Sequence, residues 1–388
     1  MAVKPATRTQ AISPFYVMDV LHRAKQQEAM GRDVIHMEIG EPDFPTPQPI
    51  IDAGIRLLQT GEVKYTPAAG LPELRAKIAS FYQQRYGISV AANRIFVTPG
   101  ASGAFLLALG ASLNAGETLL MADPCYPCNS NFVSLFDGNT QAIAVDASTH
   151  YQLTASLIKQ HWTASTKGVL VASPSNPTGT LIAPDELKQV IQAASSLGGC
   201  FYSDEIYHGL VYGQDATSAL AYSDDVFVIN SFSKYFGMTG WRVGWLVVPE
   251  AFIEVAEKLA QNIFIATATQ SQYAALAAFD GETLLELERR RTEFAARRDF
   301  LYGHLLRLGF DIPVKPEGAF YIYAGCTRHT EDSFQFALDF LAAEGVAVTP
   351  GKDFGHHQAQ HSLRFAYTTS MDKMAEAMQR LERFINRR

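Results

Sequence analysis

The chain of 388 residues carries a formal net charge of −7 and contains 47% hydrophobic and 18% charged residues. This balance is typical of a globular enzyme and lacks the basic excess that attracts nucleic acid or anionic membranes, so we expect small molecules as partners. The first residues, MAVKPATRTQ, lack the apolar core of a secretory signal, and the cytoplasm is therefore the expected location.

Short apolar runs alternate with helical stretches from about residue 94 to residue 248, which predicts a mainly parallel sheet covered by helices. The expected strands contain the runs RIFVT, TLLMA, AIAV, GVLVA, CFYS, VFVIN and RVGWLVV. Residues 95–116 carry no formal charge, but Pro99 and several glycines interrupt them, which favours a strand, a turn and a buried helix over a membrane span. Ligands of such sheets bind beyond the carboxyl ends of the strands.

The pattern becomes helical after Pro249, and residues 284–306 predict one long helix. Its arginines at 289–291, 297 and 298 are most simply interpreted as a solvated helix face. The last part combines AFYIYAG, a helix over 332–344, VAVTP, LRFAY and a closing helix from Met371. This pattern predicts a separate α+β unit of about a hundred residues.

Three loops that follow predicted strands carry polar groups. Gly100, in VTPGASGA, lets the chain turn into a helix whose free N–H groups form an anion site, although tight strand–helix packing is an equal alternative. Asn176, in SNPTG, is equally consistent with a simple turn. In SDEIY, Asp204 and Glu205 point to opposite faces, so one of them faces the site and needs a cationic partner.

Two cations stand near the same sheet. Lys234, in NSFSKYFGMTGWRVGW, follows a strand, and Arg242 lies eight residues further along. A partly buried lysine is costly unless it is neutral or covalently used, as in a Schiff base, although capping of a loop is the ordinary alternative. Arg364, in SLRFAYT, requires a planar acid, supplied either by the protein or by a substrate.

Metal binding is not predicted. Cys125 and Cys128 have Cys-x-x-Cys spacing, but the other two cysteines stand alone, so four unpaired thiols are the simpler interpretation. His357 and His361, in HHQAQH, have the spacing of a helical metal pair, yet Gly355 and the strand-like SLRFAY flank them, which favours a loop.

In chain order, IGEPDF, YTPAAGLPELR, TPGASGA, DPCYP, SNPTG, SDEIY, SFSKYFGMTGWRVGW and LRFAY closely resemble the class I/II aminotransferases, pyridoxal-phosphate (PLP) enzymes of fold type I. The resemblance spans about residues 39–368. It implies an α/β fold with a mainly parallel seven-stranded sheet in a large PLP-binding domain, residues 46–282, and a smaller α+β domain built from 1–45 and 283–388. It also implies an enzyme of amino-acid metabolism that moves the amino group of an L-amino acid to a 2-oxo acid by a ping-pong mechanism.

The resemblance implies roles for individual residues. Lys234 would bind the cofactor covalently and move the proton at the substrate α carbon, while Asp204 would pair with the pyridine nitrogen. Tyr207 and Asn176 would hydrogen-bond the phenolic oxygen, and Tyr126, between the two cysteines, would stack on the ring. The phosphate would be held by Gly100, Ala101, Ser102, Ser231, Ser233 and Arg242.

Substrate and partner roles follow from the same resemblance. Arg364 would hold the substrate α-carboxylate with help from Gly40 and Asn176. Tyr65 would reach the phosphate of the neighbouring subunit, which implies a homodimer with shared active sites.

Two positions and two alternatives bear on the activity. Some aspartate-preferring relatives carry lysine at the position of Ser102, and many carry an aromatic residue at the position of Asn129, which argues against a strict aspartate preference. The same residues would also serve a carbon–sulfur β-lyase or other α-carbon chemistry. A non-catalytic PLP-binding regulator is a further alternative, disfavoured because no DNA-binding module is present and every expected catalytic position is filled.

Overall fold

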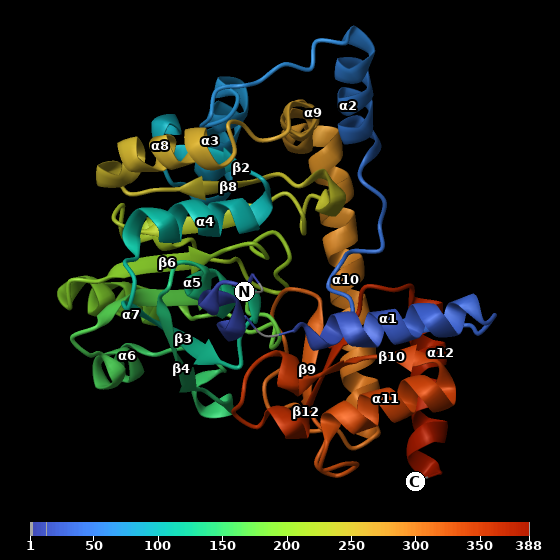
Figure 1. Cartoon of the computed structure of the whole chain (residues 1–388). Coiled ribbons are helices and arrows are strands. Elements are labelled where there is room, and N and C mark those ends of the chain that lie inside the picture. The colour runs from blue at the N-terminus through green and yellow to red at the C-terminus, as the bar shows by residue number, and fades with distance from the viewer. Residues whose placement is uncertain (1–2, 13, 388) are drawn as a thin grey trace.

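The structure, a computed structural model, describes residues 3–12 and 14–387. Figure 1 shows two parts of the molecule. One is a large sheet with the helices that cover it, the other is a smaller group of strands and helices, and the long helix α10 connects them. The first helix, α1, lies on the smaller group together with the C-terminal elements, so distant parts of the chain meet there.

The large sheet has seven strands among the described residues, in the order β2-β8-β7-β6-β5-β3-β4. Their bounds are β2 (Ile95–Thr98), β3 (Thr118–Asp123), β4 (Asn139–Ala144), β5 (Thr166–Ala172), β6 (Cys200–Asp204), β7 (Phe227–Ser231) and β8 (Gly244–Val247). Neighbouring strands are parallel except β8, which runs antiparallel to both β7 and β2. The predicted mainly parallel sheet is therefore confirmed, and each predicted run contributes a strand.

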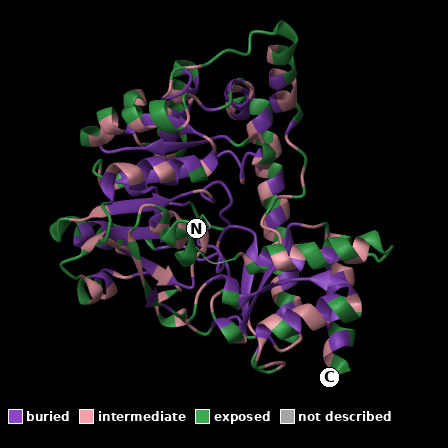
Figure 2. Ribbon diagram, in the orientation of Figure 1, coloured by how far each residue is buried: buried purple, intermediate pink, exposed green. Residues whose placement is uncertain are grey.

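Alternate residues of the strands enter two separate cores, because successive side chains point to opposite faces of a sheet. Phe96 and Leu246 pack with α4, α5 and α8, whereas their neighbours Val97 and Trp245 pack with α3, α7 and α10. Figure 2 shows buried strands between helices that expose only their outer faces. The helices of this part are α2 (Gln48–Thr60), α3 (Pro72–Tyr86), α4 (Gly100–Ser112), α5 (Cys128–Leu135), α6 (Ala155–His161), α7 (Pro184–Ser196), α8 (Ile253–Ile263) and α9 (Thr269–Leu276).

The uncharged segment 95–116 forms strand β2, a turn and helix α4, as predicted. Within the described part of the chain, no helix combines the length and apolar character that crossing a bilayer requires.

The smaller group contains an antiparallel sheet of β11 (Thr349–Pro350), β12 (Ser362–Ala366) and β9 (Tyr321–Gly325). Beside it, β1 (Ile35–His36) pairs in parallel with β10 (Val346–Ala347). The associated helices are α1 (Tyr16–Ala29), α11 (Ser333–Glu344) and α12 (Met371–Asn386). The predicted helices near the C-terminus are confirmed, and α1 and β1 pack among them.

Helix α10 (Gly281–Arg307) confirms the predicted long helix, but the solvated arginine face was wrong for Arg290 and Arg297. Arg290 and Arg297 are only 7% and 2% exposed. Arg297 donates hydrogen bonds to Asp43 at 2.7 Å and Glu293 at 2.6 Å, and its guanidinium lies 4.8 Å from the ring centroid of Phe44. The reason is helical periodicity: positions 287, 290, 294, 297 and 301 form one buried stripe, and two arginines occupy places in it.

Candidate active site

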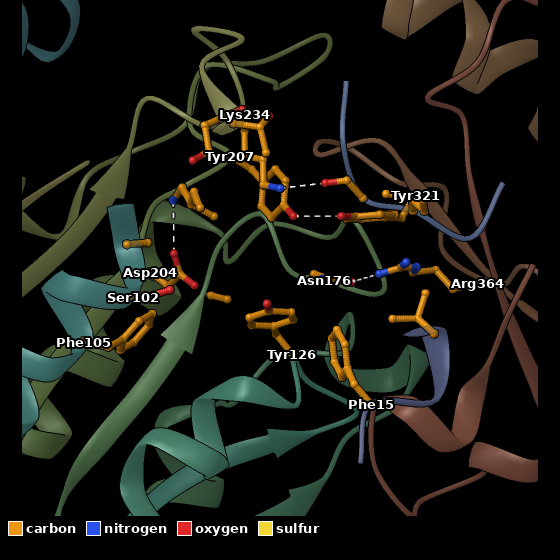
Figure 3. A pocket seen from close by; sticks show the side chains of 18 of the residues that line it. Phe15, Ser102, Phe105, Tyr126, Asn176, Asp204, Tyr207, Lys234, Tyr321 and Arg364 are labelled. Carbon is orange, nitrogen blue, oxygen red and sulfur yellow. Dashed lines mark hydrogen bonds between the residues drawn. The ribbon is translucent and has the colours of Figure 1, made fainter. Parts of the chain in front are cut away.

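A cavity of about 270 Å³ lies beyond the carboxyl ends of β5, β6 and β7, and residues of β9 and β12 in the small antiparallel sheet also line it. Most of the predicted site residues line it, as Figure 3 shows for those labelled. These lining residues are Gly40, Ala101, Ser102, Tyr126, Asn176, Asp204, Tyr207, Ser233, Lys234, Arg242 and Arg364. The fold therefore brings together side chains that are scattered from residue 40 to residue 364 of the sequence.

Lys234 follows β7 and extends into this cavity (Figure 3). Its Nζ donates a hydrogen bond of 2.7 Å to the carbonyl oxygen of Gly40 and lies 5.8 Å from the ring centroid of Phe320. Burial lowers the pKa of Lys234 to about 8, because removal from water disfavours the charged form. The amine can thus take up and release protons near neutral pH.

Asp204 is the last residue of β6 and is buried beside the cavity. It accepts a hydrogen bond from the backbone N–H of Ile206 at 3.2 Å, and burial raises its pKa to about 7. Glu205 points away and accepts from Ser218 at 3.0 Å and from the backbone of Ala219 at 2.8 Å. The two carboxyls face opposite sides as predicted, and Asp204 is the one available to a cation in the cavity.

The start of helix α4 forms the anion-binding end of the cavity. Gly100 has φ +68°, and a Cβ there would lie 2.7 Å from Nη2 of Arg242, so only glycine allows the guanidinium this close to the helix N-terminus. Arg242 also donates to the carbonyl oxygen of Thr239 at 3.1 Å. A guanidinium beside free helix N–H groups fits a phosphate.

Three predicted cofactor residues do not line this cavity: Ser231, Tyr65 and Gly100, which lies behind Arg242. The hydroxyl of Ser231 donates to Ser233 Oγ at 2.9 Å, so it supports a residue that lines the cavity. Tyr65 is 82% exposed on the surface.

Arg364 lies at the opposite end of the cavity, on β12, and is 4% exposed. Its Nη1 donates to Asn176 Oδ1 at 2.9 Å, and its Nη2 donates to the carbonyl oxygen of Glu38 and to Thr349 Oγ1. No acidic side chain of residues 3–12 and 14–387 forms a salt bridge with it, and its Nε has no acceptor. Of the two alternatives for Arg364, the structure thus disfavours a protein carboxylate and leaves a substrate carboxylate.

The four cysteines and the histidine-rich segment do not line the cavity. All four cysteines are free thiols, and burial raises the pKa of Cys125 to about 12, which keeps it in the unreactive form. The histidine-rich segment is a loop with a short 3₁₀ turn, whose backbone N–H groups at His356 and His357 donate to the carboxylate of Asp123. The described residues contain no cluster of potential metal ligands.

Several lining residues were missed by sequence reasoning. Tyr321, on β9, places its hydroxyl 3.0 Å from that of Tyr207. An apolar wall is formed by Phe15, Val17, Met18, Leu21, Phe105 and Phe132. The spacing of the first four indicates one face of a helix, which by itself is the pattern of any packed amphipathic helix. Asn129, in contrast, is buried in α5 and does not line the cavity.

Comparisons with known proteins agree with this geometry. The family model for aminotransferase class I and II matches residues 32–381. The chain belongs to the class I and II aminotransferases.

This aminotransferase is 38% identical to the valine–pyruvate aminotransferase of Mycobacterium tuberculosis, over 95% of this chain and 96% of that protein. It is 33% identical to the aspartate aminotransferase of Geobacillus stearothermophilus over the full length of both. A crystal structure of an aminotransferase from Mycobacterium tuberculosis superposes with a TM-score of 0.96 at 36% identity, covering 100% of both chains. These relatives establish an amino-group transferase and favour that activity over a β-lyase or a regulator.

Proposed function

We propose that this aminotransferase binds PLP between Lys234, Asp204 and Arg242, and binds the α-carboxylate of its substrate at Arg364. When bound, PLP supplies an electron sink that stabilises negative charge at the substrate α carbon. The observation that carries the proposal is that a lysine of lowered pKa shares one cavity with a buried carboxyl and with a guanidinium that lacks a protein carboxylate.

Lys234 is the covalent anchor and the proton carrier. With a pKa of about 8 its amine is neutral in a far larger fraction near pH 7 than that of an ordinary lysine, and the neutral form is the one that attacks an aldehyde carbon. Once substrate displaces it, the same amine takes the proton from the α carbon and returns it elsewhere. The carbonyl oxygen of Gly40 keeps the amine directed into the cavity.

Asp204 fixes the protonation of the cofactor ring. Its buried carboxyl has a pKa raised to about 7, and pairing with a cation such as a pyridinium N–H would favour its ionised form near neutral pH. Tyr207 and Asn176 provide the hydrogen bonds to the phenolic oxygen, and Tyr126 provides a flat surface for the ring.

The phosphate is held where α4 begins. The backbone N–H groups near Gly100 and Ala101, the hydroxyls of Ser102 and Ser233, and the guanidinium of Arg242 supply the donors. Ser231 contributes through its hydrogen bond to Ser233.

The substrate carboxylate binds Arg364, whose Nε remains available and whose plane is fixed by Asn176 and the ring of Tyr321, 4.2 Å away. Gly40 leaves room there, because a Cβ at this position would lie 1.9 Å from the hydroxyl of Tyr321.

A homodimer with shared sites is part of the proposal. Tyr65 is 82% exposed, and Ile55, Leu58 and Val63 near it are also exposed, which supports burial of this segment against a second copy. There the phenol of Tyr65 would hydrogen-bond the phosphate in the partner's site. The four free thiols support a reducing compartment such as the cytoplasm.

The proposed domain boundaries are residues 46–282 for the large domain and 1–45 with 283–388 for the small one. The pairing of β1 with β10 supports the contribution of both termini to the small domain. Such a division lets the small domain close over substrate and exclude water.

The test compares the cofactor-loaded wild type with Lys234→Ala and with Lys258→Ala, a control on the exposed surface of α8. We expect borohydride to fix the cofactor on the peptide containing Lys234 in the wild type and the control only. Amino-acid addition should yield 2-oxo acid without ammonia. Pyruvate and ammonia from a cysteine-type substrate, without conversion of the cofactor to its amine form, would show a lyase instead.

A further inference from the structure

We propose that the site selects amino acids with apolar side chains, and that the inner face of helix α1 is the surface that selects them. We define this inner face as Val17, Met18 and Leu21 of the helix together with Phe15, which immediately precedes it. The inference rests on the proposed function, since it assumes that Arg364 holds the α-carboxylate. It adds the class of substrate, which the activities named for the relatives leave open, because those include both valine and aspartate transamination.

The charged residues of the cavity are already engaged. Four charged side chains line it: Asp204, Lys234, Arg242 and Arg364. Arg242 lies at the phosphate end beside Gly100, and Arg364 lies at the carboxylate end beside Asn176. Lys234 and Asp204 act on the reacting carbon and the cofactor ring. Among residues 3–12 and 14–387 of this chain, no further lining cation remains to neutralise a carboxylate in the side chain of a substrate.

The part of the wall formed by the inner face, Phe105 and Phe132 is hydrocarbon. Phe15 lies edge-on to Tyr126, with ring centroids 6.1 Å apart, and faces the cavity (Figure 3). Phe105 and Phe132 stack on each other at 5.3 Å on the side of α4 and α5. A charged side chain placed against this wall would lose its hydration without a compensating partner, whereas an aliphatic side chain would gain from leaving water.

The inner face is connected to the strand that carries Arg364. The carboxylate of Asp353 accepts hydrogen bonds from the backbone N–H groups of Tyr16 at 2.7 Å and Val17 at 3.3 Å, which fixes the first turn of α1. Asp353 follows β11 closely, and β11 pairs with β12 so that Thr349 lies opposite Arg364. Asp353, β11 and β12 therefore connect the inner face, which meets the side chain, to the arginine that holds the carboxylate.

Other cations near α1 are turned away or paired. Arg23 lies on the outer side and binds Asp19 at 3.0 Å, and Lys352 pairs with Asp332 at 3.3 Å. Neither lines the cavity. The selectivity therefore depends on the inner face itself.

The experiment measures the half-reaction of the cofactor-loaded enzyme with L-leucine, L-methionine, L-valine, L-aspartate and L-glutamate. We expect at least one apolar amino acid to exceed both acidic ones at least tenfold in the second-order rate constant, in the range typical of hydrocarbon pockets. A faster reaction with aspartate or glutamate than with every apolar amino acid would overturn the inference while leaving the proposed function intact. Absence of reaction with every amino acid tested would overturn both.

A binding measurement without turnover provides a second readout. Calorimetric titration of the loaded enzyme should show tighter binding of 4-methylpentanoate than of succinate, since both carry the carboxylate but only succinate carries a second charge. Equal or tighter binding of succinate would contradict an apolar pocket.

A charge swap locates the determinant. Met18→Lys places an ammonium on the inner face at a side chain that is 54% exposed, so folding should survive. It should raise the aspartate-to-leucine ratio of rate constants at least tenfold. Ala29→Lys adds the same charge at the far end of α1 and should leave the ratio unchanged. An equal ratio in both variants would show that the inner face does not select the side chain.

Discussion

The hydroxyl groups of Tyr207 and Tyr321 lie 3.0 Å apart, one from the turn after β6 and the other from β9 of the small sheet. This hydrogen bond joins the two sides of the cavity. The bond holds the phenol of Tyr207, which we assign to the cofactor, against strand β9. The ring of Tyr321 on that strand also supports Arg364.

Replacement of Tyr321 by phenylalanine removes this bond and keeps the ring. We expect kcat/KM to fall about fivefold, the equivalent of a hydrogen bond of about 1 kcal/mol. Tyr323→Phe is the matched control, because Tyr323 lies on the same strand but does not line the cavity. A similar loss in both variants would mean that the effect is structural.

The lowered pKa of Lys234 predicts a pH dependence for cofactor attachment. The rate of attachment to cofactor-free protein should rise with pH and level off above about 8, where the amine is mostly neutral. An ordinary lysine, with a pKa of about 10.5, would be only roughly 0.3% neutral at that pH. Borohydride trapping at timed intervals measures the rate, with Nα-acetyl-lysine as reference. A rate that keeps rising tenfold per pH unit up to pH 10 would contradict the lowered pKa.

His36 links helix α1 to β1 through two carboxylates. Its Nδ1 lies 2.7 Å from Glu38 and its Nε2 lies 3.1 Å from Glu28, and the hydrogen bond to Glu38 is the main cause that raises the pKa of His36 above its usual value. A raised folded-state pKa means that the stabilisation is complete below pH 6.5 and is lost as pH rises through the folded-state value.

Accordingly, wild type should exceed His36→Gln in stability by about 1 kcal/mol near pH 6, and the difference should shrink toward pH 9. Thermal denaturation across this range measures it. His22→Gln, which removes an exposed histidine on α1 that hydrogen-bonds Gln26, is the control. A stability difference between wild type and His36→Gln that widens as pH rises would contradict a raised pKa of His36.

Arg297 predicts a stability effect for the buried stripe of α10. Arg297→Met removes hydrogen bonds to Asp43 and Glu293, whose side chains remain 30% and 37% exposed and so can rehydrate. We expect a loss of about 2 kcal/mol, measured as a lower urea midpoint with an unchanged slope. Arg289→Met, on a side chain 60% exposed, should change the midpoint little.

The sequence predicted the parts of the site that sit at strand ends. Asp204 and Lys234 each follow an apolar run, so their placement at the sheet edge could be derived from the pattern. The inner face of α1 could not, because Phe15 and Met18 have the spacing of any packed helix and only tertiary structure shows that they face a cavity. Arg297 was misjudged for the same reason: charge alone indicates solvent, whereas the helical period places it inside.

The hydrogen bond from Arg364 to the carbonyl of Glu38 spans 326 residues of sequence. A ribosome completes the lysine, the aspartate and the whole large sheet well before it adds Arg364, Asp353 or the strand that pairs with β1. The early segment around Gly40 and helix α1 must therefore wait for partners that are synthesised last. During translation, the end of the cavity that we propose for the substrate carboxylate is thus completed last.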